Sequence, residues 1–281
     1  MQKNFTKKIC NKKYKVLMIT IIIVVYKSDR KKLNNILQKL SKDFKIIIID
    51  NSTDYNFDNI TINKNVNIVR SSNIGNGAAI NKAINICNTS IAIYMDIDVN
   101  IQENFINQFL EWSNQIADFS ILVPNHGNLL SENKIIEKYD GEASIMLFNL
   151  KKIKNKNIFD ENYFLYFEET DLFFRFKKNG LKVFFIKDLV ISHQRASSIE
   201  NETSAISNLR SWHYMWSMFY FYKKNFSYTY ALKKTYILLI KDFIILLSSM
   251  LTFDFKNTKL RFYRLYGLVS SMICLKSFLR P

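Results

Sequence analysis

Two aspartates stand two residues apart, directly after a run of aliphatic residues. Asp96 and Asp98 follow residues 91–95, with Ile97 between them. Side chains two residues apart on an extended segment point to the same side. Paired carboxylates after a buried strand offer the hard oxygen ligands that Mg²⁺ and Mn²⁺ prefer, and such a metal can neutralise charge on a leaving diphosphate. Because short motifs of this kind also match by chance in solvated loops, the pair indicates a metal site only in combination with other signals.

A second group of acids follows an apolar, aromatic-rich segment. Glu168, Glu169 and Asp171 lie within four residues, directly after residues 159–167. Carboxylates held beside apolar walls tend to have raised pKa values, which suits a general base. Acids in this position also favour the start of a helix, because the helix N-terminus carries partial positive charge. The two interpretations are compatible, and composition does not separate them.

Two weaker signals lie elsewhere in the chain. The segment from Asn73 through Gly75 to Gly77 leads into a predicted helix, so its glycines would let the backbone approach a phosphate at the helix N-terminus. A tight turn without a ligand is the default reading of such a loop. His193 ends a short apolar run and would be a metal ligand if the fold brings it near Asp98. A histidine in this setting is more often structural.

The elements that must position these residues alternate between strand and helix up to about residue 100. Continuous aliphatic runs predict strands buried on both faces, and the alternation predicts a parallel, doubly wound sheet. Ligands bind such sheets at the carboxyl ends of the strands, where Asp50 and Asp96 fall. The predicted strands cover residues 16–25, 46–49, 66–69, 91–95, 144–148, 183–186 and 190–191. The predicted helices cover residues 33–40, capped by Ser28 or Asp29, then 80–87, 103–116 and 169–178, the last ended by Gly180.

The end of the chain differs in character from the rest. Trp212 and Trp216 open an aromatic stretch, and the apolar residues 236–251 follow, interrupted by Lys241 and Asp242. This run is short for a membrane-spanning helix, which needs roughly 20 apolar residues. Flanking aromatic and basic residues favour a helix that lies in the membrane interface.

Basic residues are concentrated at the two ends of the chain. The formal net charge is +16; residues 1–18 contain six lysines and no acid, while residues 203–281 contain twelve basic residues and two acids. The middle of the chain is balanced. This distribution predicts a basic tail over 1–15, a catalytic domain over 16–205 and a helical region over 206–281 that contacts an anionic surface.

The order of these motifs resembles that of glycosyltransferase family 2, the inverting group with the GT-A fold, and particularly its bacterial rhamnosyltransferase-like branch. The resemblance covers about residues 17–200, and residues 159–175 are its most distinctive part. Lys27, Glu142 and Glu169 depart from the family pattern, the last by replacing an aspartate. The matching segments are Val25-Tyr26-Lys27, Asp50-Asn51-Ser52, Asn73 to Asn81, Asp96-Ile97-Asp98, Phe159 to Arg175 and His193 to Ser198.

The resemblance implies an α/β GT-A fold, with a mostly parallel sheet flanked by helices, and direct displacement at the anomeric carbon with inversion. Glu169 would be the base, with Glu168 and Asp171 as alternates, and His193 would join Asp96 and Asp98 in binding Mn²⁺ or Mg²⁺. The donor would be dTDP-rhamnose or a UDP-hexose, and the acceptor a glycan or lipid-linked glycan of a surface polysaccharide. The residues that would bind the donor are Tyr26, Asp50, Asn73, Gly75, Asn81 and Asp96.

Other functional classes fit the sequence less well. A nucleic-acid-binding protein would explain the basic, aromatic C-terminal region, but no recognised motif is present and no nucleic acid partner is expected. An inactive GT-A scaffold would not need the intact acids, and a nucleotidyltransferase would not need residues 159–175. Cys10, Cys87 and Cys274 are far apart and odd in number, which is typical of reduced thiols. We therefore expect a cytoplasmic enzyme, peripheral on the inner face of the plasma membrane.

Overall fold

Four parallel strands form one half of an eight-stranded sheet. The computed structural model describes residues 19–40, 44–52, 56–58, 60, 62–127, 129, 131–193 and 204–280, without the side chain of His193. The predicted basic tail over 1–15 lies outside this part of the chain. Aliphatic runs supply these strands. Each of the two inner strands of this half pairs with a parallel neighbour on both sides. Their order in the sheet is β3 (Val66–Arg70), β2 (Lys45–Asp50), β1 (Ile19–Val25) and β4 (Ile91–Met95).

The second half of the sheet is mixed. One strand, β8, runs antiparallel to both of its neighbours, while β6 and β9 are parallel to each other. The sequence pattern does not predict β6, whose register with β9 shifts between Pro124 and Asn125. Proline cannot donate a hydrogen bond to a neighbouring strand, so a proline in the sequence argues against a central strand there. From β4 outward the order is β8 (Ile145–Asn149), β6 (Ile121–Asn125), β9 (Val183–Val190) and β7 (Ile135–Glu137).

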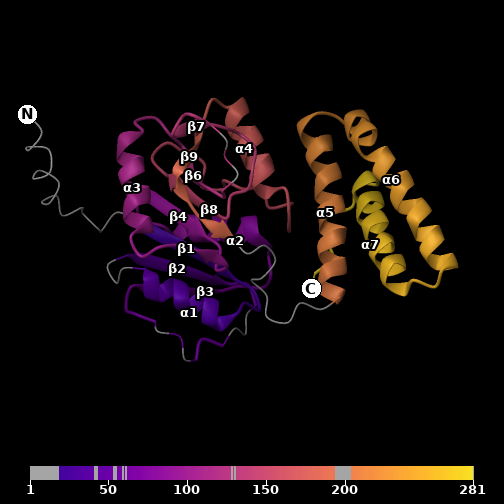
Figure 1. Ribbon diagram of the computed structural model, residues 1–281, viewed down its shortest axis with the longest axis horizontal. Helices are drawn as coiled ribbons and strands as arrows, with labels where there is room; N and C mark the ends of the chain where they lie inside the picture. The colour runs from indigo at the N-terminus through magenta and orange to yellow at the C-terminus, as the bar shows by residue number, and fades with distance from the viewer. Residues whose placement is uncertain are drawn as a thin grey trace, which may run out of the picture.

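Helices cover both faces of the sheet, as the predicted α/β fold requires. Successive residues of β1 point to opposite faces. Ile21 and Ile23 pack in one buried cluster with helices α1 (Arg30–Lys39) and α3 (Phe105–Gln115). Ile22 packs in the buried cluster of the opposite face with helices α2 (Asn76–Ile86) and α4 (Glu168–Lys178). Figure 1 shows α1 and α3 along the sheet and α4 beyond β9.

The predicted helix boundaries agree with the observed local chemistry. Asp29 caps α1, because its carboxylate accepts from the backbone N–H of Lys31 at 2.8 Å. Gly180 follows the end of α4 with a φ of 68°, in the left-handed region that glycine adopts at little cost. A two-stranded ribbon pairs β5 (Val99–Asn100) with β10 (Ser192–His193).

Three helices form the C-terminal part of the chain. Figure 1 shows α5 (Ser204–Asn225), α6 (Tyr228–Leu251) and α7 (Phe255–Met272) side by side beyond one end of the sheet. Close approach of α7 to α5 depends on Gly267, where an added Cβ would lie 2.2 Å from the carbonyl oxygen of Trp212. None of the helices in the described part of the chain is long and apolar enough to cross a membrane. The division at residue 206 stays a prediction.

Candidate active site

A pocket of about 570 Å³ lies where β1, β2 and β4 end. This is the edge at which open α/β sheets bind ligands. Residues from α5 close another side of the pocket. Of the residues predicted to carry function, those that line it are Tyr26, Asn73, Gly75, Asp96, Asp98, Glu168 and Glu169.

The two aspartates that follow β4 both face this pocket. Tyr94 donates a hydrogen bond to Oδ1 of Asp96, and its own hydroxyl accepts from Nδ2 of Asn76 at 3.0 Å. Burial, followed by the nearby charge of Asp96, raises the pKa of Tyr94 well above its ordinary value, so the hydroxyl keeps its proton. Asp98 is only 8% exposed. Two carboxylates therefore share one wall of the pocket.

These carboxylates fit a divalent cation. Mg²⁺ is commonly held by one or two carboxylates together with substrate phosphates, so a third protein ligand is not required. The ribbon pairs the backbone of His193 with that of Val99, the residue after Asp98. The side chain of His193 lies outside the described residues. Among the side chains that the structure describes, no group of three or more His, Cys, Asp or Glu could hold a metal ion.

The first turn of α4 presents two glutamates to the pocket. Glu168 is 5% exposed, and its Oε2 has no hydrogen-bond partner among the described residues. Burial chiefly, and then repulsion from Glu169 and Asp96, raises the pKa of Glu168 well above its ordinary value. The pKa of Glu169 is also raised, mainly by loss of solvent and further by Glu142. A raised pKa makes each carboxylate more basic, which is the direction that a general base requires.

The glycine loop is shaped by the segment that precedes those glutamates. Gly75 has a φ of 91°, and a Cβ there would lie 2.5 Å from the carbonyl oxygen of Phe164. That carbonyl accepts a hydrogen bond from the backbone N–H of Asn76 at 3.3 Å. Glycine is thus required for close packing of two backbones, with the N-terminus of α2 beside the pocket.

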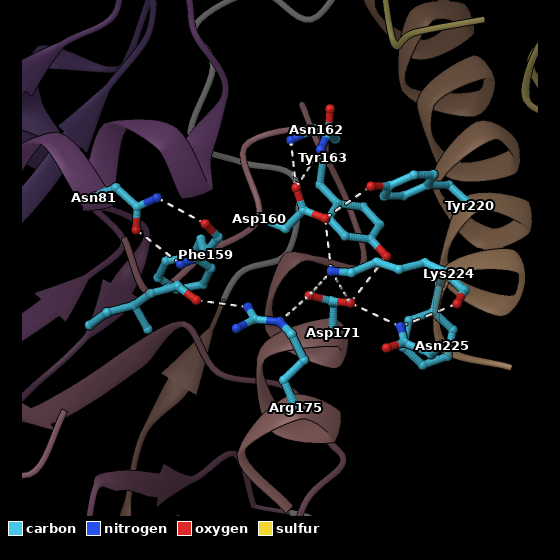
Figure 2. Close-up of polar contacts among 12 residues, drawn as sticks. Asn81, Phe159, Asp160, Asn162, Tyr163, Asp171, Arg175, Tyr220, Lys224 and Asn225 are labelled. Carbon is cyan, nitrogen blue, oxygen red and sulfur yellow. Dashed lines mark hydrogen bonds and ion pairs between the residues drawn. The ribbon is translucent and has the colours of Figure 1, made fainter. Parts of the chain in front are cut away.

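Of the predicted site residues whose side chains the structure describes, three do not line the pocket. Asp50 is buried at the end of β2, where it accepts from the backbone N–H of Ser52 at 2.9 Å. Asn81 is buried and exchanges two hydrogen bonds of 2.9 Å with the backbone of Phe159 (Figure 2). Asp171 is fully buried among cationic and amide groups. These residues hold the segments that form the pocket.

The pocket also contains residues that the sequence analysis did not single out. Tyr94 stands two residues before Asp96, and this spacing on an extended segment was a usable signal. The α5 residues carried no local signal, because only tertiary packing brings that helix to the sheet. The α5 side chains that line the pocket are Ile206, Leu209, Arg210 and His213.

This arrangement agrees with a family comparison. The model of the family described as Glycosyl transferase family 2 matches residues 20–173, more than half of the chain. The chain belongs to glycosyltransferase family 2. It is therefore a glycosyltransferase. No curated protein matches the sequence.

Two solved structures share the fold of this glycosyltransferase. Residues 1–349 of Staphylococcus aureus TarS, in complex with UDP-GlcNAc, are 12% identical with a TM-score of 0.51, over 92% of this chain and 93% of that one. The mannosyltransferase PcManGT from Pyrobaculum calidifontis, in complex with GDP-Man and Mn²⁺, is 11% identical with a TM-score of 0.50, over 90% and 86%. A further match spans 39% of a longer TarS chain. The GT-A fold is confirmed.

Proposed function

We propose that the chain transfers a hexose or deoxyhexose from a nucleotide-diphosphate donor to a glycan hydroxyl, with inversion at the anomeric carbon. One observation carries the proposal: a single pocket contains both the Asp96–Asp98 pair and the Glu168–Glu169 pair. The first pair suits a metal-bound diphosphate, and the second suits a base. The structures of TarS with UDP-GlcNAc and of PcManGT with GDP-Man and Mn²⁺ support a nucleotide-sugar donor and a divalent metal.

On the donor side, Asp96 and Asp98 would hold Mn²⁺ or Mg²⁺, with His193 as a third ligand. When bound, the metal supplies positive charge to the leaving diphosphate. Tyr94 orients the carboxylate of Asp96 through its hydrogen bond. The other donor contacts would come from Tyr26, Asn73 and Gly75 on the pocket wall, with Asp50 and Asn81 supporting them from behind.

On the acceptor side, Glu169 would remove the proton from the attacking hydroxyl. The acceptor oxygen then bonds to the anomeric carbon, while the bond from that carbon to the diphosphate oxygen breaks. Glu168 is the first alternate, because it lines the same pocket and burial raises its pKa as well. Asp171 is a weaker alternate, since its carboxylate is ion-paired with Arg175 and Lys224.

The rhamnosyltransferase-like motifs favour dTDP-rhamnose as donor, followed by UDP-hexoses. The acceptor would be a lipid-linked glycan, reached from the cytoplasmic face of the plasma membrane. An apolar surface on α6 supports this membrane partner. Its exposed side chains recur at helical spacing and are Tyr236, Ile237, Ile240, Phe243, Ile244, Leu247, Met250 and Leu251.

Nucleotide release from a panel of sugar nucleotides, with and without Mn²⁺, tests the proposal. We expect release that needs the metal and is abolished by Asp98→Ala without loss of the folded state. Asp140→Ala is the matched control, because its carboxylate is exposed and pairs only with Lys138 among the residues described here. Metal-independent turnover in wild type, or full activity of Asp98→Ala, would remove the metal assignment. A wild type that releases no nucleotide from any donor would remove the proposed function.

A further inference from the structure

Helix α5 packs directly against the segment that leads into α4. Ser217 donates a hydrogen bond of 2.9 Å to the carbonyl oxygen of Leu165. The rings of Tyr163 and Tyr220 meet edge to face with centroids 5.0 Å apart. This segment ends at the two glutamates of the pocket, so α5 supports the stretch of backbone that delivers them.

The end of α5 carries a cation into this contact. Nζ of Lys224 lies 2.8 Å from Oδ2 of Asp160 and 2.8 Å from each carboxylate oxygen of Asp171. Asn225 donates a further hydrogen bond of 2.9 Å to Oδ1 of Asp171. Figure 2 shows these groups converging from α5 and from α4 on one point.

Arg175 completes the network from within α4. Its Nε lies 2.6 Å from Oδ2 of Asp171, and its Nη2 donates a 2.7 Å hydrogen bond to the carbonyl oxygen of Ile158. Two cations thus balance two carboxylates, one of which, on Asp171, is fully buried. Such a pair is held in one geometry, because either charge left alone would be costly to bury.

The network acts on the first turn of α4. The backbone N–H of Asp171 donates to the carbonyl oxygen of Phe167 at 2.9 Å, which makes it part of the first helical turn. Glu168 and Glu169 belong to the same turn. A rigid turn transmits the position of one side chain to the others, so a group that holds Asp171 also sets where the glutamates point.

We infer that Lys224 is a positioning residue for glycosyl transfer: by holding Asp171 it fixes the first turn of α4 with Glu168 and Glu169 aimed into the pocket. The inference rests on the proposed function. Lys224 does not line the pocket and acts through Asp171. It also gives α5 a part in the catalytic unit, beyond the residues that the family model covers.

Lys224→Met tests the inference through nucleotide release at varied donor concentration. We expect kcat to fall on the order of 10²-fold, since small displacements of a catalytic group cost about that much. The KM for the donor should not change, because the donor side of the pocket is untouched. Lys224→Arg should restore most of kcat. Lys223→Met is the matched control, since Lys223 contacts Tyr220 and Cys274 and neither acid.

A second variant keeps the test decisive if Lys224→Met does not fold. The double substitution Asp160→Asn with Lys224→Met removes one negative and one positive charge, so the charge balance of the network is preserved. It should fold and show the same loss of kcat. Full kcat in folded Lys224→Met or in the folded double variant, or a loss explained entirely by a smaller folded fraction, would overturn the inference while leaving the proposed function intact. A wild type without nucleotide release would overturn both.

Discussion

The hydroxyl of Tyr94 donates a hydrogen bond to Oδ1 of Asp96, two residues further along the chain. Tyr94, near the end of β4, and Asp96 and Asp98, which follow the strand, all line the pocket. Asn76, in the glycine loop, donates to the same hydroxyl at 3.0 Å. The loop at the start of α2 and the aspartate pair are therefore linked through one buried phenol.

Tyr94→Phe should weaken metal-dependent nucleotide binding by about 10- to 150-fold, because a hydrogen bond to a charged group contributes about 1.5–3 kcal/mol. The fold should survive, since the ring is retained. Calorimetric titration of UDP and TDP in the presence of Mn²⁺ measures the effect. Tyr139→Phe is the matched control, because its hydroxyl donates to the carboxylate of Glu137 instead. Equal affinities for wild type and Tyr94→Phe would show that this hydrogen bond does not orient Asp96.

Glu169→Gln should keep donor binding but lose transfer. The substitution preserves shape and removes basicity, so the loss should appear in kcat, by about 10²–10⁴-fold. Glu168→Gln and Asp171→Asn, assayed in parallel, separate the alternates. If Glu169→Gln turns over normally and Glu168→Gln is inactive, the base is Glu168. Activity in all three variants would rule out a base in this cluster.

The predictable parts of the fold are those with a local cause. Aliphatic runs located β1, β2, β3 and β4, and strand ends placed Asp96 and Asp98 at the ligand edge. The strand at Ile121–Asn125 could not be predicted from its sequence, because it contains a proline. The motifs that contain them predict a catalytic role for Asp171 and a donor-binding role for Asn81. In the structure, both side chains contact other protein groups. Whether an acid faces a pocket or an ion pair depends on tertiary neighbours, which a short motif does not record.

His213 makes the stability of the protein sensitive to acid. The residue is 1% exposed, with Nε2 3.0 Å from the carbonyl oxygen of Leu279 and Nδ1 3.2 Å from the hydroxyl of Ser277. Burial is the main cause that lowers the pKa of His213 to about 4. A lowered histidine pKa means that the unfolded chain binds the proton more readily, so stability present above the ordinary histidine pKa is lost as pH falls.

From these values, uptake of a proton by His213 on unfolding should lower the free energy of unfolding by about 2 kcal/mol as the pH falls from about 7 to about 5. Urea unfolding at the two pH values measures this loss. His213→Gln cannot take up the proton but keeps a donor for Leu279, so its pH dependence should be smaller by that amount. Identical pH dependence in wild type and variant would show that His213 does not titrate on unfolding.

The outward face of α6 is mostly apolar, with Lys241 exposed among the apolar side chains, while the one acidic residue of the helix is buried. Asp242 is 1% exposed and pairs with Arg261 at 2.6 Å and Arg264 at 2.8 Å. The exposed stripe from Tyr236 to Leu251 is continued by Phe253 and Phe255, each 77% exposed. An apolar helix face beside an excess of basic residues suits an anionic bilayer, where each basic residue contributes about 1 kcal/mol.

Ile240→Glu and Ile244→Glu should each reduce co-sedimentation with anionic liposomes, because both side chains are more than half exposed on this stripe. Point substitutions are needed, since removing everything after residue 205 would also remove the α5 wall of the pocket. Ile86→Glu, at an exposed position on α2, is the matched control. Wild-type binding should weaken in high salt without vanishing, and neutral liposomes should bind less. Equal partitioning of all variants would exclude the stripe as the anchor.

Two other results would assign the stripe a different role. Release of wild type by detergent alone, never by salt or alkaline carbonate, would mean that the helix is integral to the membrane. If wild type binds no liposomes but self-associates, and the two substitutions abolish that self-association, the stripe is an interface between copies of this chain.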